Sequence, residues 1–440
     1  MRFLPVFERG HARLAGDARC RDEEGMFLGK AICLGAPGAA VTLRARGREL
    51  GIMFFRHDWS GIVEITIAGR THRVDLFSPM PMTWIFEASL PDSWSGTDVT
   101  VRVVREKHEA SKAHQAWIQA AYTSQILTSE IPDLLLDRVD PDPFTGWTLN
   151  QLTDVFKWYD PEWMAAMRSL GCSPPYQPPD FVHRKSWEWT HCLFGLDCLG
   201  SLRPEHRGLG VGVGWEPLSF FLSNHVGEVV ATDLYPARSE WSEAGVREGN
   251  PEILDDPDKF APFPYRRDRL RFLSMDGRRL DFPEDSFDFV WSCSSIEHFG
   301  GHEGSAQSMR EIDRILRPGG IACVITEYVL PDPATGRHAL FDREFFNLRC
   351  LWEYIVRPAE RLRLIQRLDL TIPDYYVRRA CVLPHEAGAP HSGSTKPHVV
   401  LRAGSGALVT SIALFFRKEG GTRPLPPPTL WAGRGATLKP

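Results

Sequence analysis

Apolar and polar residues alternate along much of the first 110 residues, and this alternation predicts β-strands. Within GIVEITIAGR, Val63, Ile65 and Ile67 fall on one face while the residues between them are polar. Residues 39–47 alternate in the same way, and glycine, aspartate and proline separate the runs. Short alternating runs with such punctuation are typical of antiparallel sheets. We therefore expect an all-β sandwich over residues 1–110.

The period-two alternation stops in the following 90 residues, and we expect a helical connecting or cap region over 111–200. Residues 111–128 can form a helix, and the best helix candidate, KSWEWTHCLFGLDCLG, ends at Gly200. Within it, Trp187 and Trp189 either fill the core or line a cleft.

From Arg207 onward, short apolar runs alternate with segments that can be helical, which predicts βαβ units and a mostly parallel sheet. Two runs near the end, 398–403 and 409–417, flank a Gly-Ser-Gly turn and predict an antiparallel pair. We therefore expect an α/β domain over 201–420 and a flexible tail, rich in proline and glycine, over 421–440. The strands expected in the parallel part are 207–211, 228–232, 270–274, 287–292 and 321–327.

Charge and cysteine content narrow the class of protein. The net charge of -5 and the pI of about 6.3 show no excess of basic residues of the kind that nucleic-acid-binding proteins use. Nine cysteines, with no C-x-x-C pair, argue against a disulfide framework or a zinc site and for a reducing compartment. The first residues carry charges too early, and too short an apolar core, for a signal peptide, so we expect none. The given sequence has no apolar run of the roughly 20 residues needed to span a bilayer. We expect a cytoplasmic protein without a membrane span.

A glycine-rich turn between strand and helix marks a candidate ligand site. In RGLGVGVGWEPLSFFLS, Gly212 and Gly214 let the backbone turn sharply and approach a ligand closely. The amides that open the next helix would face that ligand. The dinucleotide fingerprint G-x-G-x-x-G does not fit, because Pro217 stands at its third glycine. A cofactor without a pyrophosphate is therefore favoured over NAD or FAD.

Acidic residues follow the next two expected strands. Asp233 ends GEVVATD, where a carboxylate can bind both hydroxyls of a ribose. Met275 and Asp276 follow the third strand, where the carboxylate can accept from an adenine amino group and the thioether can pack on the ring. Asp276 could equally cap the turn at Gly277. Because the carboxyl ends of parallel strands share one sheet edge, these side chains should converge.

The order of these motifs resembles the class I S-adenosylmethionine (SAM)-dependent methyltransferases, over residues 207–330. A G-x-G turn, an acid after the second strand, M-D-G after the third, FDFVWSCSSIEH and L-R-P-G-G follow one another in that family's order. The resemblance implies a Rossmann-like, mostly parallel seven-stranded sheet and SAM as cofactor. It assigns cofactor binding to Gly212, Val213, Gly214, Glu216, Asp233, Leu234, Met275, Asp276, Gly277, Cys293 and Ser294.

Two departures from the family pattern concern the glycine loop. Gly210 stands where the usual acid precedes the first core glycine, and Glu216 stands where the third glycine is usual. We infer that Glu216, at the mouth of the loop, holds the methionine ammonium in place of the missing acid.

The loop after the fourth strand supplies the candidate catalytic groups. An alcohol acceptor loses a proton as it is methylated, and His298 is the first candidate for the base because imidazole titrates near neutrality. Glu297 either orients the imidazole or is the base itself, and a structural role for His298 stays open. His298 and His302 have H-x-x-x-H spacing, but two intervening glycines disfavour a helix, so no metal is expected. The reserve candidates are His302, Glu327 and Tyr328.

The segment GIMFFRHDWSGIVEITIAGRTHRVDLFS, residues 51–78, resembles the galactose-binding-like jelly rolls appended to carbohydrate-active enzymes, and this resemblance implies a carbohydrate acceptor. We therefore expect O-methylation of a sugar hydroxyl in a glycan or glycolipid. An alternative is methylation of a small phenolic or amine metabolite, with the jelly roll serving assembly into a homo-oligomer. Another is a catalytically inactive SAM-fold protein that acts as a glycan-binding or scaffold partner. The candidate sugar-contacting residues, which could instead fill the sandwich core or an interface, are Arg56, His57, Asp58, Trp59, Trp84 and Trp94.

Overall fold

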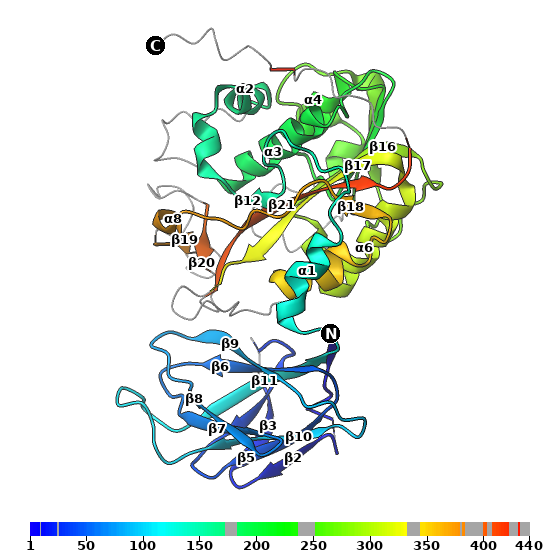
Figure 1. Cartoon of the computed structure of the whole chain (residues 1–440). Coiled ribbons are helices and arrows are strands. Elements are labelled where there is room, and N and C mark those ends of the chain that lie inside the picture. Colours follow the sequence, from blue (N-terminus) through cyan, green and yellow to red (C-terminus); the bar gives the residue numbers. More distant parts are fainter. Residues whose placement is uncertain are drawn as a thin grey trace.

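A computed structural model of the chain contains an N-terminal β domain and a C-terminal α/β domain, with helix α1 (Ile131–Leu136) near their junction (Figure 1). Within the part of the chain that the structure describes, no helix has the length and apolarity needed to cross a membrane. The described residues are 1–8, 10–23, 26–171, 183–235, 251–331, 344–378, 381–382, 399–402, 407–421 and 430–431.

Two antiparallel sheets form the N-terminal domain, as the alternation predicts. One has the order β3-β4-β11-β6-β9, with β1 on β11, and the other has the order β2-β5-β10-β7-β8. Val63, Ile65 and Ile67 are buried in the core between the sheets, because side chains two residues apart share a face. The strands are β1 (Arg2–Phe3), β2 (Ala12–Ala15), β3 (Ala18–Asp22), β4 (Lys30–Leu34), β5 (Ala40–Ala45), β6 (Glu49–Arg56), β7 (Ile62–Ile67), β8 (Arg70–Asp75), β9 (Met82–Ser89), β10 (Thr97–Val103) and β11 (Ala116–Ser124).

Strand β11 corrects the expected domain boundary at residue 110 and the helix expected over 111–128. It pairs with both β4 and β6 and so lies in the middle of its sheet. One face, with Ile118, packs in the sandwich core, and the other, with Tyr122, packs on the C-terminal domain. A strand buried on both faces loses the period-two signal, which is why the sequence pattern pointed elsewhere.

Truncation tests this boundary. We expect a fragment that ends at Lys112 to lack cooperative unfolding, because β4 and β6 lose the strand that joins them. A fragment that ends at Leu127 keeps β11 and should unfold cooperatively with a β-rich circular dichroism spectrum. A fragment ending at Lys112 that folds as well as the longer one would contradict the place of β11.

The connecting region does not form a separate layer, because its elements join the C-terminal domain. Strand β12 pairs with β21 (Leu408–Lys418), and α3 packs on β21 and on strands β16 (Phe287–Cys293) and β17 (Leu316–Val329). Helix α3 matches the best helix candidate of the sequence. The remaining elements here are η1 (Thr128–Glu130), β12 (Gln151–Leu152), η2 (Val155–Tyr159), α2 (Pro161–Ser169) and α3 (Arg184–Cys198).

Counted over the described residues, the sheet of the C-terminal domain has ten strands, where seven were expected. The order is β15-β14-β13-β16-β17-β21-β20-β19, and β12 and β18 add to β21. In this order the five strands from β15 through β14, β13 and β16 to β17 are parallel to one another, and β21 runs antiparallel to β17. The strands are β13 (Arg207–Val211), β14 (Glu228–Asp233), β15 (Leu270–Ser274), β16 (Phe287–Cys293), β17 (Leu316–Val329), β18 (Leu362–Leu364), β19 (Cys381–Val382), β20 (Leu401–Arg402) and β21 (Leu408–Lys418).

All five strands expected for the parallel part are present, and β20 and β21 form the expected antiparallel pair within the described residues. The extra strands are only two or three residues long, too short to give a periodic signal. The helices are α4 (Pro217–Ser223), η3 (Pro251–Leu254), η4 (Pro257–Lys259), η5 (Arg267–Arg269), η6 (Ile296–His298), α6 (Gly301–Ile315), α7 (Leu348–Cys350), the π-helix Leu351–Val356 and α8 (Asp374–Arg378).

Part of the expected flexible tail packs on the C-terminal domain. Trp431 is only 1% exposed and stacks between Phe194 of α3 and Phe221 of α4. The Leu430 N–H donates to Asp197 at 2.7 Å. Hydrophobic burial of one large aromatic side chain stabilises this contact, although the surrounding composition is typical of a tail.

Candidate active site

A cavity of about 160 Å³ opens at the carboxyl edge of the parallel strands. Its walls come from the loop after β13, the ends of β14 and β15, and the loop after β16. The sequence placed a ligand at this edge. The lining residues are Gly212, Asp233, Leu234, Met275, Asp276, Gly277, Arg278, His298, Phe299 and Gly300.

The backbone turn at Gly212 leaves no room for a side chain. Gly212 has φ +70°, and a Cβ there would lie 2.6 Å from Cβ of Ser295 and 2.8 Å from Cζ of Phe299. Ser295 also fixes the turn, because its hydroxyl donates to the Gly212 carbonyl at 2.5 Å. Only glycine satisfies both the backbone conformation and the contact.

Asp233 ties the end of β14 to that turn. Its Oδ2 accepts from the Gly214 N–H at 2.8 Å, and its Oδ1 accepts from the Leu234 N–H at 2.7 Å. The carboxylate lies on the cavity wall. Each carboxylate oxygen can accept more than one hydrogen bond, so the group can also bind a ligand's hydroxyls.

Asp276 takes part in the turn as well as in the cavity wall. Its carboxylate accepts from the Arg278 N–H at 2.9 Å and from the Arg278 guanidinium at 2.7 Å. These hydrogen bonds hold the pKa of Asp276 below its usual value. Met275 lies beside it on the wall, with its N–H donating to the Asp233 carbonyl. Both interpretations that the sequence left open for Asp276 therefore fit its position.

Glu216 lies beneath the loop rather than at its mouth. It is buried, does not line the cavity, and its Oε1 accepts from the Trp291 indole N–H at 2.5 Å. Burial raises the pKa of Glu216 to about 8, against the effect of the indole hydrogen bond. Trp291 also explains Gly210, because a Cβ at Gly210 would lie 2.5 Å from that ring.

The other expected cofactor residues lie behind the cavity wall. Val213, Gly214, Cys293 and Ser294 are buried, and none of them lines the cavity. The structure instead adds residues that the sequence analysis missed, Arg278, Phe299 and Gly300. They directly follow the motif residues Gly277 and His298, so their position next to known motifs was the signal that could have found them.

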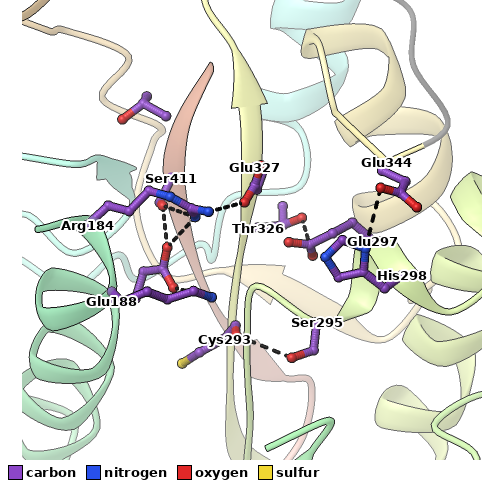
Figure 2. Close-up of polar contacts among 12 residues, drawn as sticks. Arg184, Glu188, Cys293, Ser295, Glu297, His298, Thr326, Glu327, Glu344 and Ser411 are labelled. Carbon is purple, nitrogen blue, oxygen red and sulfur yellow. Dashed lines mark hydrogen bonds and ion pairs between the residues drawn. The ribbon is translucent and has the colours of Figure 1, made fainter. Parts of the chain in front are cut away.

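His298 lies on the cavity wall, and its Nδ1 lies 3.5 Å from Oε2 of Glu344 (Figure 2). Burial opposes protonation of the imidazole, but the Glu344 hydrogen bond and the charge of Glu297 outweigh it, so the pKa of His298 is raised. The histidine therefore reaches the cavity that the motif residues line.

Glu297 points away from the cavity into the protein. Its side chain is buried, and its Oε2 accepts from the Thr326 hydroxyl at 2.9 Å (Figure 2). Burial raises the pKa of Glu297, and the charge of Glu327 adds to this effect. Glu297 is thus placed to influence the imidazole of His298 rather than to meet a ligand in the cavity.

The reserve candidates do not line the cavity. His302 is buried, with its Nε2 2.8 Å from the Phe345 carbonyl oxygen, and Tyr328 is buried in the sheet. Glu327 forms an ion pair with Arg184 at 2.5 Å. No group of three potential metal ligands occurs among the described residues.

Buried charges near the start of α3 form a cluster that the sequence analysis did not single out (Figure 2). Arg184 lies between Glu188, at 2.9 Å, and Glu327 of β17. Burial opposes ionisation of Glu188, but Lys185 and Arg184 outweigh it and lower its pKa to about 2. These ion pairs hold the start of α3 against β17.

The two tryptophans of α3 have different environments. Trp187 is fully buried and stacks on His191, with ring centroids 4.5 Å apart, so it belongs to the core. Trp189 is half-buried and packs against the same core. Neither lines the cavity.

Known proteins resemble the part of the chain that carries the site. Residues 208–324 match the model of a family described as "Methyltransferase domain". Methyltransferase GfsG of Streptomyces halstedii is 39% identical over 71 residues, which are 16% of this chain and 24% of that protein. The uncharacterized methyltransferase YcgJ of Bacillus subtilis is 25% identical over 131 residues, 30% of this chain and 44% of that protein. The chain thus spans less than half the length of these relatives.

Solved structures show the same kind of similarity. The YcgJ structure from Bacillus subtilis has a TM-score of 0.31 at 18% identity and covers 50% of this chain and 95% of its own. A putative sarcosine dimethylglycine methyltransferase from Galdieria sulphuraria has a TM-score of 0.34 at 15% identity and covers 59% and 99%. The family match and the motifs around the cavity agree: residues 208–324 are similar to SAM-dependent methyltransferase domains.

Proposed function

We propose that the chain transfers a methyl group from SAM to a hydroxyl oxygen, most specifically to a sugar hydroxyl of a glycan or glycolipid. The observation that carries the proposal is the position of His298, which shares one cavity wall with the glycine turn and Asp233. One cavity thereby joins the residues suited to a nucleoside with a group that can remove a proton.

The residues of the cavity fit SAM. The glycine turn offers a cradle that a Cβ at Gly212 would fill, and the Asp233 carboxylate can bind ribose hydroxyls. Met275 and Asp276, which line the cavity, would face the adenine. SAM, when bound, supplies a methyl group activated by a sulfonium.

The protein's own work is to position the acceptor, exclude water and take up its proton. A neutral imidazole at His298 can accept that proton, and Glu297 and Glu344 then stabilise the imidazolium that forms. This is the chemistry that an alcohol needs. A phenol is more acidic than an alcohol, and a neutral amine can attack first and lose its proton afterwards, so both depend less on a base. A small phenolic or amine metabolite is therefore the second candidate acceptor.

Two exposed aromatic side chains of the N-terminal domain support a carbohydrate acceptor. Trp59 is 48% exposed and Trp94 is 94% exposed, and exposed indoles can stack on sugar rings. Trp84 is instead buried in the sandwich core, so the core-filling alternative holds for that residue.

The polar residues near Trp59 are engaged within the protein. The guanidinium of Arg56 donates to the Phe77 carbonyl at 2.6 Å. Nδ1 of His57 accepts from the Trp59 N–H at 3.0 Å, and Asp58 forms an ion pair with Lys112. A glycan at this surface would therefore depend on Trp59 and on the outer sides of these groups.

Transfer of labelled methyl from SAM to fractionated cell-envelope glycans tests the proposed function, alongside SAM calorimetry and a glycan array. Incorporation into a glycan fraction, with binding of both SAM and glycan, is expected. SAM binding with transfer only to small phenols or amines would favour the metabolite alternative. Glycan binding without any SAM binding would favour an inactive scaffold.

A further inference from the structure

The loop that carries His298 is braced by one short segment, Glu344–Cys350. At its start, the Glu344 carboxylate meets Nδ1 of His298 at 3.5 Å (Figure 2). The next residue, Phe345, offers its carbonyl oxygen 2.8 Å from Nε2 of His302, in the first turn of α6. Two successive residues of the segment thus contact the two histidines that flank the glycines of the catalytic loop.

The middle of the segment is fixed to the sheet. The Phe346 N–H donates to the Glu327 carbonyl at 2.9 Å, and the Phe346 carbonyl accepts from the Val329 N–H at 2.9 Å. The Phe346 side chain is fully buried. The position of Glu344 is therefore set by backbone pairing two residues away.

The far end of the segment is held by the N-terminal domain. Arg349 is buried and forms an ion pair with Glu49 of β6. Its guanidinium also donates to the Ile126 carbonyl at 3.0 Å and to the Thr128 hydroxyl at 2.5 Å. Burying a guanidinium without charge and hydrogen-bond partners costs free energy. These contacts therefore hold the Arg349 end of the segment in place.

We propose that Glu344 is a positioning residue for His298, and that the N-terminal domain, through the Glu49–Arg349 ion pair, holds the segment that presents it. The inference rests on the proposed role of His298 as the base. A carboxylate at one imidazole nitrogen fixes the tautomer and leaves the other nitrogen free of its proton. With Glu344 at Nδ1, Nε2 is the nitrogen that takes the acceptor's proton.

Several other charges surround His298, so the test must isolate Glu344. Glu297 and Glu327 lie on the protein side, and both raise the pKa of His298. Asp233, Asp276 and Arg278 line the cavity with it. Glu344→Gln removes one charge and keeps the shape of the side chain. Glu419→Gln is the matched control, because Glu419 is 48% exposed against 52% for Glu344 and forms an ion pair with Arg363 at 2.5 Å.

The first experiment follows the His298 imidazole by NMR titration of the full chain without cofactor, and then measures turnover. In Glu344→Gln the titration is expected to move to lower pH, because a negative partner of the imidazolium is lost. Turnover should fall about 10-fold, as when an orienting partner is removed, with the Kd for SAM unchanged. Glu419→Gln should alter neither quantity. An unmoved titration with normal turnover would overturn the role of Glu344.

The second experiment uses Glu49→Gln to test whether the N-terminal domain holds the segment in place. The control is Asp98→Asn, which changes a surface ion pair of the same domain. The His298 titration should move in the same direction as in Glu344→Gln, and turnover should fall roughly 2- to 30-fold. Thr128→Val, which removes one bond to Arg349, is the milder variant should Glu49→Gln not fold. If a folded Glu49→Gln or Thr128→Val protein matches Asp98→Asn in both the His298 titration and turnover, the N-terminal domain does not hold the segment in place. Normal turnover in His298→Ala would instead refute the role of His298 as the base. The His298 titration in Glu344→Gln would still show whether Glu344 acts on the imidazole.

Discussion

Replacement of His298 by alanine is expected to lower turnover by about 10²–10⁴-fold while SAM affinity stays nearly unchanged. The reason is that general base catalysis contributes a factor of this size to proton removal from an alcohol. His298 lies on the cavity wall, whereas Glu297 points into the protein. Turnover and SAM calorimetry on the same preparation measure the two effects separately.

The rate of the unmutated enzyme should rise with pH through the pKa of His298, because the neutral imidazole is the active form. That pKa is raised, since Glu344 and Glu297 favour the imidazolium more than burial opposes it. The rise should therefore be centred above about 6.5, the usual value for imidazole.

Two outcomes would change the assignment of the base. A collapse of turnover in Glu297→Gln, with His298→Ala nearly normal, would make the carboxylate the base. A His298→Ala protein that loses stability and SAM affinity together, with little effect on turnover, would make the histidine structural.

Replacement of Asp233 by alanine is expected to weaken SAM binding by roughly 1.5–3 kcal/mol, the usual contribution of hydrogen bonds to a charged group. The carboxylate lies on the cavity wall and also accepts from the Gly214 N–H, so its loss removes a ligand contact and loosens the glycine turn. Calorimetry with SAM and with S-adenosylhomocysteine measures the change.

Asp98→Ala, on the surface of the N-terminal domain, is the control for Asp233→Ala and should leave the affinity unchanged. A Kd for Asp233→Ala equal to that of the unmutated protein would place the ribose contact elsewhere. Saturable NADH binding without any response to SAM would contradict the cofactor itself.

The sequence by itself determined the C-terminal architecture and the location of the cavity. Strands such as Arg207–Val211 and Leu270–Ser274 were found at their observed bounds, because buried parallel strands are short apolar runs with clear punctuation. Gly212, Asp233 and Met275 then converge of necessity, because parallel strands place their carboxyl ends at one edge.

Only the tertiary structure decided which side chains face that cavity and what supports them. Glu216 is drawn beneath the loop by the Trp291 indole, a partner 75 residues away in sequence. Strand β11 escaped detection because both of its faces are buried by different domains. Glu344 reaches His298 through a segment anchored on Glu49, almost 300 residues earlier in the chain. Local periodicity reports which residues are buried, but it carries no information about the long-range partners that bury them.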